Sequence, residues 1–281
     1  MKTHLECLPC FLRQTVIALK QVSGIQDLQQ EIFHEVLAVM QKTDMNMPPA
    51  YTTTFIHRTI RNRLGQDPFR KIKSDYNTIA LRLYPELRKM VSNSRDPLWT
   101  AARLAIAGNI IDFGIFTSID IDKSVASALE ETIAVDDYDS FKNAVNERNT
   151  VLYLLDNSGE IVFDRLLIEQ LVRKGKKVRA VVKGSPVLND VTMEDAAQTN
   201  LPDLCEVVDN GSDAIGTILE LTSPEFQALF QAADFIISKG QGNFETITNT
   251  GKETYFLFQS KCDVVSKELG LSLGSMLLKK S

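Results

Sequence analysis

The stretch VLYLLDNSGEIVFDRLLIEQL, residues 151–171, joins two kinds of local structure through a short polar turn. Residues 151–155 form a continuous apolar run, which is typical of a strand that is buried on both faces of a parallel sheet. From residue 160 onward the apolar residues recur at three-to-four spacing, which indicates an amphipathic helix. The turn between them contains Asp156, Asn157, Ser158, Gly159 and Glu160. The stretch therefore predicts one strand–turn–helix unit of an α/β domain.

Four more short apolar runs follow, separated by helical stretches. They are KVRAVV (177–182), CEVVD (205–209), DFIIS (234–238) and TYFLF (254–258). Strands that alternate with helices form parallel sheets through right-handed crossovers. We therefore predict a Rossmann-like, three-layer α/β/α domain with a parallel sheet of about five strands over residues 148–281.

Residues 1–147 show a helical pattern throughout. Asp67-Pro68 and Asp96-Pro97 each resemble an N-cap followed by proline at the first helical position, so helices are expected to begin near residues 68 and 97. We predict an all-helical domain over residues 1–147 that contains no strand.

The composition restricts the class of protein. The chain has 281 residues, is 44% hydrophobic and carries a formal charge of −5. Lysine and arginine are dispersed, which argues against nucleic acid as a partner. No apolar run is long enough to span a membrane and no signal peptide is recognisable, so a cytoplasmic protein is expected. The sequence does not indicate an oligomeric state.

Polar residues collect after each predicted strand. The segments are DNSGE after the first strand, KGSPVLNDVT after the second, DNGSDAIGT after the third and SKGQGN after the fourth. Parallel strands end at the same edge of a sheet, where open α/β sheets bind ligands. This edge would gather Asp156, Asn157, Asn189, Asp190, Asp209, Asn210 and Lys239. Oxygen donors of this kind suit Mg²⁺ or Mn²⁺, and Lys239 with the glycines after it suits a phosphate.

Helix capping is the alternative explanation for these loops. The segment NSGE fits a capping-box-like start with Asn157 and Glu160, and TMED fits a Thr-x-x-Asp cap. Capping leaves Asp156 unexplained, because this carboxylate ends the strand and has no basic residue near it in sequence. The metal hypothesis therefore rests on Asp156.

Two features of the helical half each allow more than one interpretation. Asn109 and Asp112 are three residues apart in an apolar stretch and so share a helical face, where Asp112 either faces a cation or is solvated at a helix end. Cys7 and Cys10 form an isolated CxxC, which fits packing thiols, half of a metal site or a disulfide.

Taken together, these motifs resemble the damage-control phosphatase family, also described as the domain-of-unknown-function 89 family. The resemblance covers nearly the whole chain. It rests on the N-terminal CxxC (Cys7, Cys10), GNxxD (108–112), DNxGE (156–160), NDVT (189–192) and KGxGN (239–243).

The resemblance implies hydrolysis of phosphomonoesters of small metabolites, such as sugar phosphates, with Mn²⁺, Co²⁺, Ni²⁺ or Mg²⁺. It implies Asp156, Asn157 and Asp190 as metal ligands. Lys239 and Asn243, with Gly240 and Ser158, would contact the phosphate, and Asn109 and Asp112 would reach the site from the helical domain.

These residues are compatible with more than one mechanism. The nucleophile is a water or a carboxylate, with Asp156 and Asp190 as candidates, and Glu160 or Asp112 would be the base. The haloacid-dehalogenase type of phosphatase is a rival whose pattern has a second aspartate two residues after the first. In this sequence that position, two residues after Asp156, is Ser158. A methyltransferase that uses S-adenosylmethionine and a non-catalytic binder of phosphorylated metabolites are the alternative functions.

Overall fold

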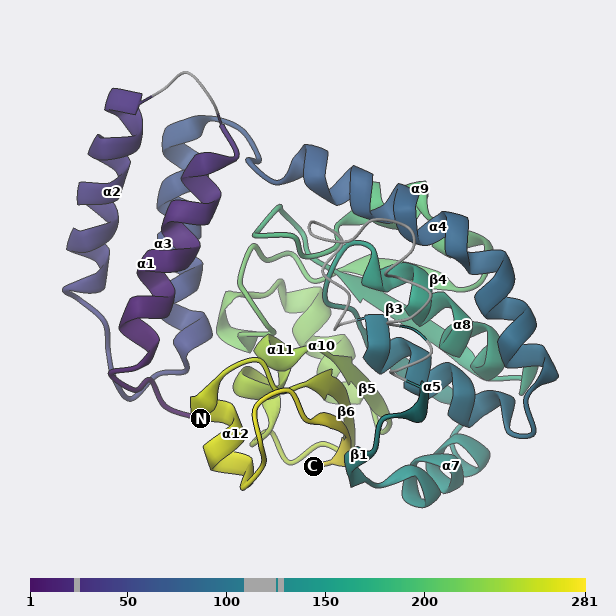
Figure 1. Ribbon diagram of the computed structural model, residues 1–281. Coiled ribbons are helices and arrows are strands. Elements are labelled where there is room, and N and C mark those ends of the chain that lie inside the picture. The colour runs from purple at the N-terminus through teal and green to yellow at the C-terminus, as the bar shows by residue number, and fades with distance from the viewer. Residues whose placement is uncertain (23–25, 109–124, 126–128) are drawn as a thin grey trace.

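A mixed sheet of seven strands forms the centre of the computed structural model, which describes residues 1–22, 26–108, 125 and 129–281 (Figure 1). The strands are β1 (Ile133–Asp136), β2 (Thr150–Leu154), β3 (Lys177–Val182), β4 (Glu206–Asp209), β5 (Ile236–Lys239), β6 (Thr254–Gln259) and β7 (Met276–Lys280). Their order is β1-β7-β6-β5-β2-β3-β4, and all neighbours are parallel except β6 and β7. The predicted α/β class is confirmed, and all five predicted strands are present.

The central strand β2 is buried on both faces, as its apolar run predicts. Val151, Tyr153 and Leu155 belong to a core shared with helices α4, α5, α7 and α8. Leu152 and Leu154 belong to a second core on the opposite face, shared with α10, α11 and α12. The sheet is therefore the middle layer of three. These helices are α4 (Arg70–Asn93), α5 (Pro97–Gly108), α7 (Tyr138–Glu147), α8 (Glu160–Arg173), α10 (Pro224–Ala232), α11 (Gln241–Ile247) and α12 (Asp263–Leu269).

The first three helices form a separate group with its own core. They are α1 (Cys7–Lys20), α2 (Gln26–Met40) and α3 (Pro49–Leu64), which stand side by side at one end of the molecule (Figure 1). Their apolar core includes Phe11, Ile32 and Ile56, and Val264 of α12 joins it. The group is thereby held against the C-terminal part of the sheet domain.

The helix starts predicted from Asp-Pro pairs are present. The backbone N–H of Phe69 donates to Asp67 Oδ1 at 2.8 Å before α4, and that of Trp99 donates to Asp96 Oδ1 at 3.2 Å in α5. The remaining short helices are α9 (Met193–Gln198), η1 (Leu201–Asp203) and η2 (Leu219–Leu221). No described helix combines the length and apolar character that a membrane-spanning segment needs.

Two strands were not predicted. Strand β1 lies inside the range 1–147, so the expectation that this range contains no strand is wrong. It has only four residues with alternating burial at the sheet edge, and its signal is therefore weak. Strand β7 ends in two lysines, which masked its pattern. The domain boundary at residue 147 stays a prediction, and α4 and α5 share a core with the sheet.

Candidate active site

The turn after β2 does not form the side-chain cap that the sequence suggests. The N-cap of α8 is Gly159, in a left-handed conformation with φ of 78°, and no side chain of the N-cap satisfies the helix. Asn157 Nδ2 instead donates to Asp156 Oδ2 at 2.5 Å and to Glu160 Oε2 at 3.2 Å. The expectation that Asn157 caps the helix is therefore wrong, because its amide is turned toward the two neighbouring carboxylates.

The loop after β3 pairs with this turn through the backbone. Ser158 N–H donates to the carbonyl of Asn189 at 2.9 Å, and Val191 N–H donates to the carbonyl of Asp156 at 2.9 Å. Asn157 and Asp190 consequently form an isolated antiparallel bridge. The three residues expected as metal ligands are brought together by main-chain geometry that does not depend on their own side chains.

The carboxyl groups of Asp156 and Asp190 form a cluster in which burial disfavours their charged forms. Burial, Glu160 and Asp190 together raise the pKa of Asp156 well above its usual range. Burial also raises the pKa of Asp190, although Lys183, whose Nζ lies 3.4 Å from Asp190 Oδ2, opposes this. A bound cation would relieve the repulsion between the two carboxylates.

The cluster faces a cavity of about 240 Å³ between the α1–α3 group and the sheet edge. Its lining includes Asp156, Asn157, Asp190, Gln14, Gln241, Glu245 and Lys261, and three cysteines, Cys7, Cys10 and Cys262. All three thiols are free, and burial raises the pKa of Cys7 and Cys10. The CxxC motif thus lies beside the candidate site.

No group of three or more His, Cys, Asp or Glu side chains within the described residues is arranged for a metal, so the expected ligand set depends on the Asn157 amide oxygen.

Lys261 is a basic residue of this cavity that sequence reasoning missed. It lies in the loop after β6, is exposed, and lowers the pKa of Asp156 through its charge. Its ammonium makes no ion pair or hydrogen bond with any residue that the structure describes. The signal that could have found it is its position after a fifth strand end at the same edge.

Lys239 is placed differently from the expectation. Its side chain is fully buried, and Nζ donates to Glu160 Oε1 at 2.5 Å, to the carbonyl of Ala105 at 2.8 Å and to Asp164 Oδ1 at 2.7 Å. Burial lowers its pKa, but Asp164 and Glu160 outweigh this and raise the pKa above its usual value. All three N–H groups are committed to the protein, so Lys239 orients Glu160 and is not free to contact a phosphate in this structure.

Other expected phosphate contacts are also engaged within the protein. Asn243 Nδ2 donates to the carbonyls of Leu155 and Lys239 at 3.3 and 2.8 Å, and its Oδ1 accepts from Thr217 at 2.7 Å. Ser158 Oγ donates to Asp195 Oδ1 at 3.0 Å. Both side chains are buried and hold neighbouring segments together.

The third strand end contributes no ligand. Asp209 is exposed and accepts from the N–H of Gly211 at 2.8 Å, while Asn210 Oδ1 accepts from Gly184 and Ser212 N–H groups at 3.2 and 2.9 Å. The expectation that these two residues join the cluster is wrong, because both stabilise local turns. Asn109 and Asp112 lie outside the described residues.

Gly240 is required by the close approach of Asp156. Its φ is 80°, and a Cβ at this position would lie 2.0 Å from Asp156 Oδ2. Gly240→Ala is expected to lower the free energy of unfolding by about 1–3 kcal/mol and to displace the Asp156 carboxylate. Gly251→Ala is the matched control, since Gly251 has φ of 71° and open space around it. Urea unfolding of both variants measures the effect, and equal losses would contradict the assigned contact.

Glu245, on α11, adds a further buried carboxyl to the cavity lining, beside Asp156 and Asp190. Burial raises its pKa to about 7. Gln241 Nε2 donates to its Oε1 at 2.8 Å, the backbone of Ala50 in α3 also bonds to it, and the N-terminal amine and Glu268 of α12 act on it by charge.

This raised pKa predicts a pH dependence of stability. Between about pH 4.5 and pH 7 the folded state holds a proton at Glu245 that the unfolded state has lost, so stability falls as pH rises, by up to about 1.4 kcal/mol per pH unit. Urea unfolding at about pH 5 and about pH 8 should therefore show a smaller pH effect for Glu245→Gln than for the wild type. An unchanged pH effect would show that Glu245 does not titrate in this window.

Comparison with known proteins identifies the family of the chain. A family model described as the damage-control phosphatase ARMT1-like domain matches residues 3–277. The chain belongs to this family. A protein of Archaeoglobus fulgidus named damage-control phosphatase is 31% identical over 287 residues, which cover 99% of each chain. An uncharacterized protein of Methanocaldococcus jannaschii is 35% identical, with coverage of 100% of this chain and 96% of the relative.

A solved structure of the family shares the fold. The crystal structure of a DUF89 family protein from Pyrococcus horikoshii superimposes with a TM-score of 0.93 at 30% identity, and covers 100% of this chain and 99% of that one. A damage-control phosphatase of the same organism is 30% identical, with coverage of 99% of this chain and 97% of the relative. The predicted family is therefore confirmed over the whole chain.

Proposed function

We propose that the protein is a metal-dependent phosphatase that hydrolyses phosphomonoesters of small metabolites. The observation that carries this proposal is the backbone pairing of the β2 and β3 loops, which gathers Asp156, Asn157 and Asp190 at one cavity. The names of the archaeal relatives support the phosphatase class.

The donor set fits a divalent cation that prefers oxygen ligands. Two mutually repelling carboxylates and one amide oxygen are offered, since Asn157 uses its Nδ2 toward Asp156 and Glu160 and so turns Oδ1 away from them. Mn²⁺, Co²⁺, Ni²⁺ or Mg²⁺ would be held by Asp156, Asn157 and Asp190. When bound, such an ion neutralises charge on the phosphoryl group.

The chain's own residues would perform three further tasks. Lys261 supplies a positive charge at the cavity that pairs with no side chain among the described residues, which suits the phosphate of the substrate. Lys239 fixes Glu160, which in turn orients Asn157. Phosphoryl transfer depends mainly on positioning and electrostatics, so this site needs no histidine. Asp156 or Asp190 as nucleophile and water as nucleophile are both compatible with the proposal.

The test removes and restores the metal. Purified protein is stripped with a chelator, and each of the four ions is added singly with p-nitrophenyl phosphate and then sugar phosphates. Phosphate release that returns with metal supports the proposal. Saturable binding of S-adenosylmethionine without phosphate release would favour the methyltransferase, and binding of sugar phosphates without turnover would favour a non-catalytic binder.

A further inference from the structure

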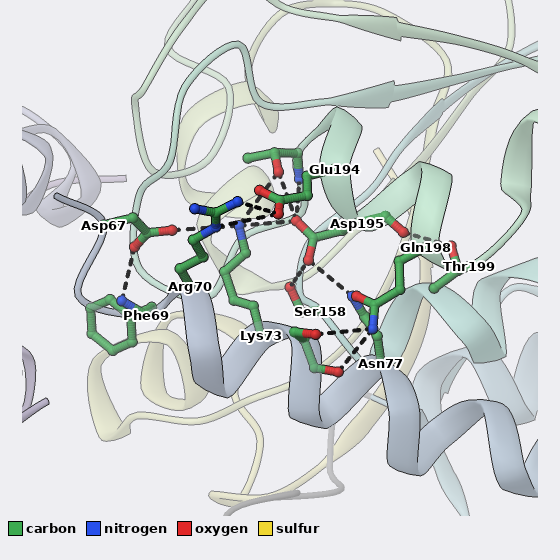
Figure 2. Close-up of polar contacts among 12 residues, drawn as sticks. Asp67, Phe69, Arg70, Lys73, Asn77, Ser158, Glu194, Asp195, Gln198 and Thr199 are labelled. Carbon is green, nitrogen blue, oxygen red and sulfur yellow. Dashed lines mark hydrogen bonds and ion pairs between the residues drawn. The ribbon is translucent and has the colours of Figure 1, made fainter.

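Two polar side chains of helix α4 bind the segments that carry the candidate site, and neither belongs to any expected ligand set. Figure 2 shows Lys73 and Asn77 extending from α4 toward Asp195 of α9. Asn77 is completely buried and Lys73 is 4% exposed. We refer to these two residues as the α4 anchor.

Asn77 takes the place of the missing cap at the start of α8. The N–H of Gly159 donates to Asn77 Oδ1 at 2.7 Å, although the two residues are far apart in sequence. Asn77 Nδ2 donates to Asp195 Oδ1 at 2.9 Å and to Gln198 Oε1 at 3.0 Å (Figure 2). One amide therefore joins the turn that follows β2 to helix α9.

Asp195 passes this connection to the loop after β3. Its Oδ2 accepts from the backbone N–H and the hydroxyl of Thr192, both at 2.8 Å, and pairs with Lys73 Nζ at 2.9 Å. Its Oδ1 also accepts from Ser158 Oγ at 3.0 Å. Both loops that carry the candidate ligands thus bind the same buried carboxylate, Asp195. The bonding residues are Ser158 and Thr192, which are two positions after Asp156 and Asp190 in the sequence.

The burial of this network makes each bond matter. Removing one partner leaves a buried polar or charged group unsatisfied, which costs more than the bond itself contributes. Movement of the two loops would lower this free-energy cost by exposing the unsatisfied group, and such movement would separate Asp156 from Asp190.

We propose that the α4 anchor is a pair of positioning residues, which set the spacing of the Asp156–Asn157 turn and the Asp190 loop through Asp195 and thereby set the affinity for a divalent cation. This inference rests on the proposed function. The residues do not touch the expected ligands, so their effect should fall on metal affinity and not on the chemistry of the filled site.

The experiment measures Mn²⁺ binding by calorimetry on the full chain. Asn77→Ala and Lys73→Met are expected to raise the Kd for Mn²⁺ by about 10–100-fold, the range for residues that orient metal ligands. Lys73→Arg should recover most of the affinity, because it keeps the charge. Saturating Mn²⁺ should return kcat of the variants to near the wild-type value.

Lys71→Met is the matched control, since Lys71 lies on the same helix, is exposed and pairs with Asp75 at 2.6 Å. If Asn77→Ala does not fold, Ser158→Ala removes a single hydroxyl from the same network and must weaken Mn²⁺ binding instead. A Kd within twofold of the wild type in folded variants, or an equal loss in Lys71→Met, would overturn the inference. Absence of Mn²⁺ binding in the wild type would instead overturn the proposed function.

Discussion

Asp156→Asn is expected to lower metal-dependent phosphate release by about a thousand-fold or more, because the loss of a charged ligand removes several kcal/mol of electrostatic stabilisation. The substitution keeps the size of the side chain and its ability to accept from Asn157, so the fold should be retained. The measurement is steady-state hydrolysis of p-nitrophenyl phosphate at saturating Mn²⁺, with circular dichroism to check the fold.

Asp209→Asn is the matched control for this variant. Asp209 is the last residue of the parallel strand β4, but it is exposed, and among the described residues its side chain accepts a hydrogen bond only from Gly211 in its own turn. Its replacement should leave hydrolysis unchanged. Activity of Asp156→Asn that equals that of the control would remove Asp156 from the proposed site.

Lys239→Met is expected to lower the free energy of unfolding by about 3–5 kcal/mol, because it leaves two carboxylates buried without their cation. Glu160 and Asp164 are 1% and 0% exposed, and both pair with Lys239. Burial raises the pKa of Asp164 to about 7 even with Lys239 present. Urea unfolding measures the loss.

Two further variants identify the origin of this loss of stability. Lys174→Met, at an exposed position after α8, should cost little. Adding Asp164→Asn to Lys239→Met should recover part of the lost stability, since one of the uncompensated charges is removed. If the two lysine variants lose equal stability, the buried network does not stabilise the fold as described.

The strand–helix alternation was readable from sequence because it depends on local patterns. The run 151–155 and the helix from residue 160 were placed correctly, since a doubly buried strand and an amphipathic helix have distinct periodicities. The Thr192 capping box was likewise predicted and is present, because both partners lie within four residues. Strand β1 was missed because pairing with β7 stabilises it, and that contact joins distant parts of the chain.

The partners of polar side chains were the part that sequence could not supply. Lys239 was expected to meet a phosphate, but the topology places Asp164, one turn into α8, beneath it. The true partner of the α8 start is Asn77, a residue with no local signature. Convergence of the strand ends could be predicted, whereas the choice between ligand and structural roles at each end depends on long-range packing.

The proposed metal site is tested most directly by the amount of Mn²⁺ that the wild type, Asp190→Asn and Asp209→Asn bind in equilibrium dialysis. A metal site formed by Asp156, Asn157 and Asp190 predicts stoichiometric, saturable binding by the wild type and by Asp209→Asn, and a loss of that binding in Asp190→Asn. Equal binding by all three proteins would contradict a metal site formed by the paired β2 and β3 loops.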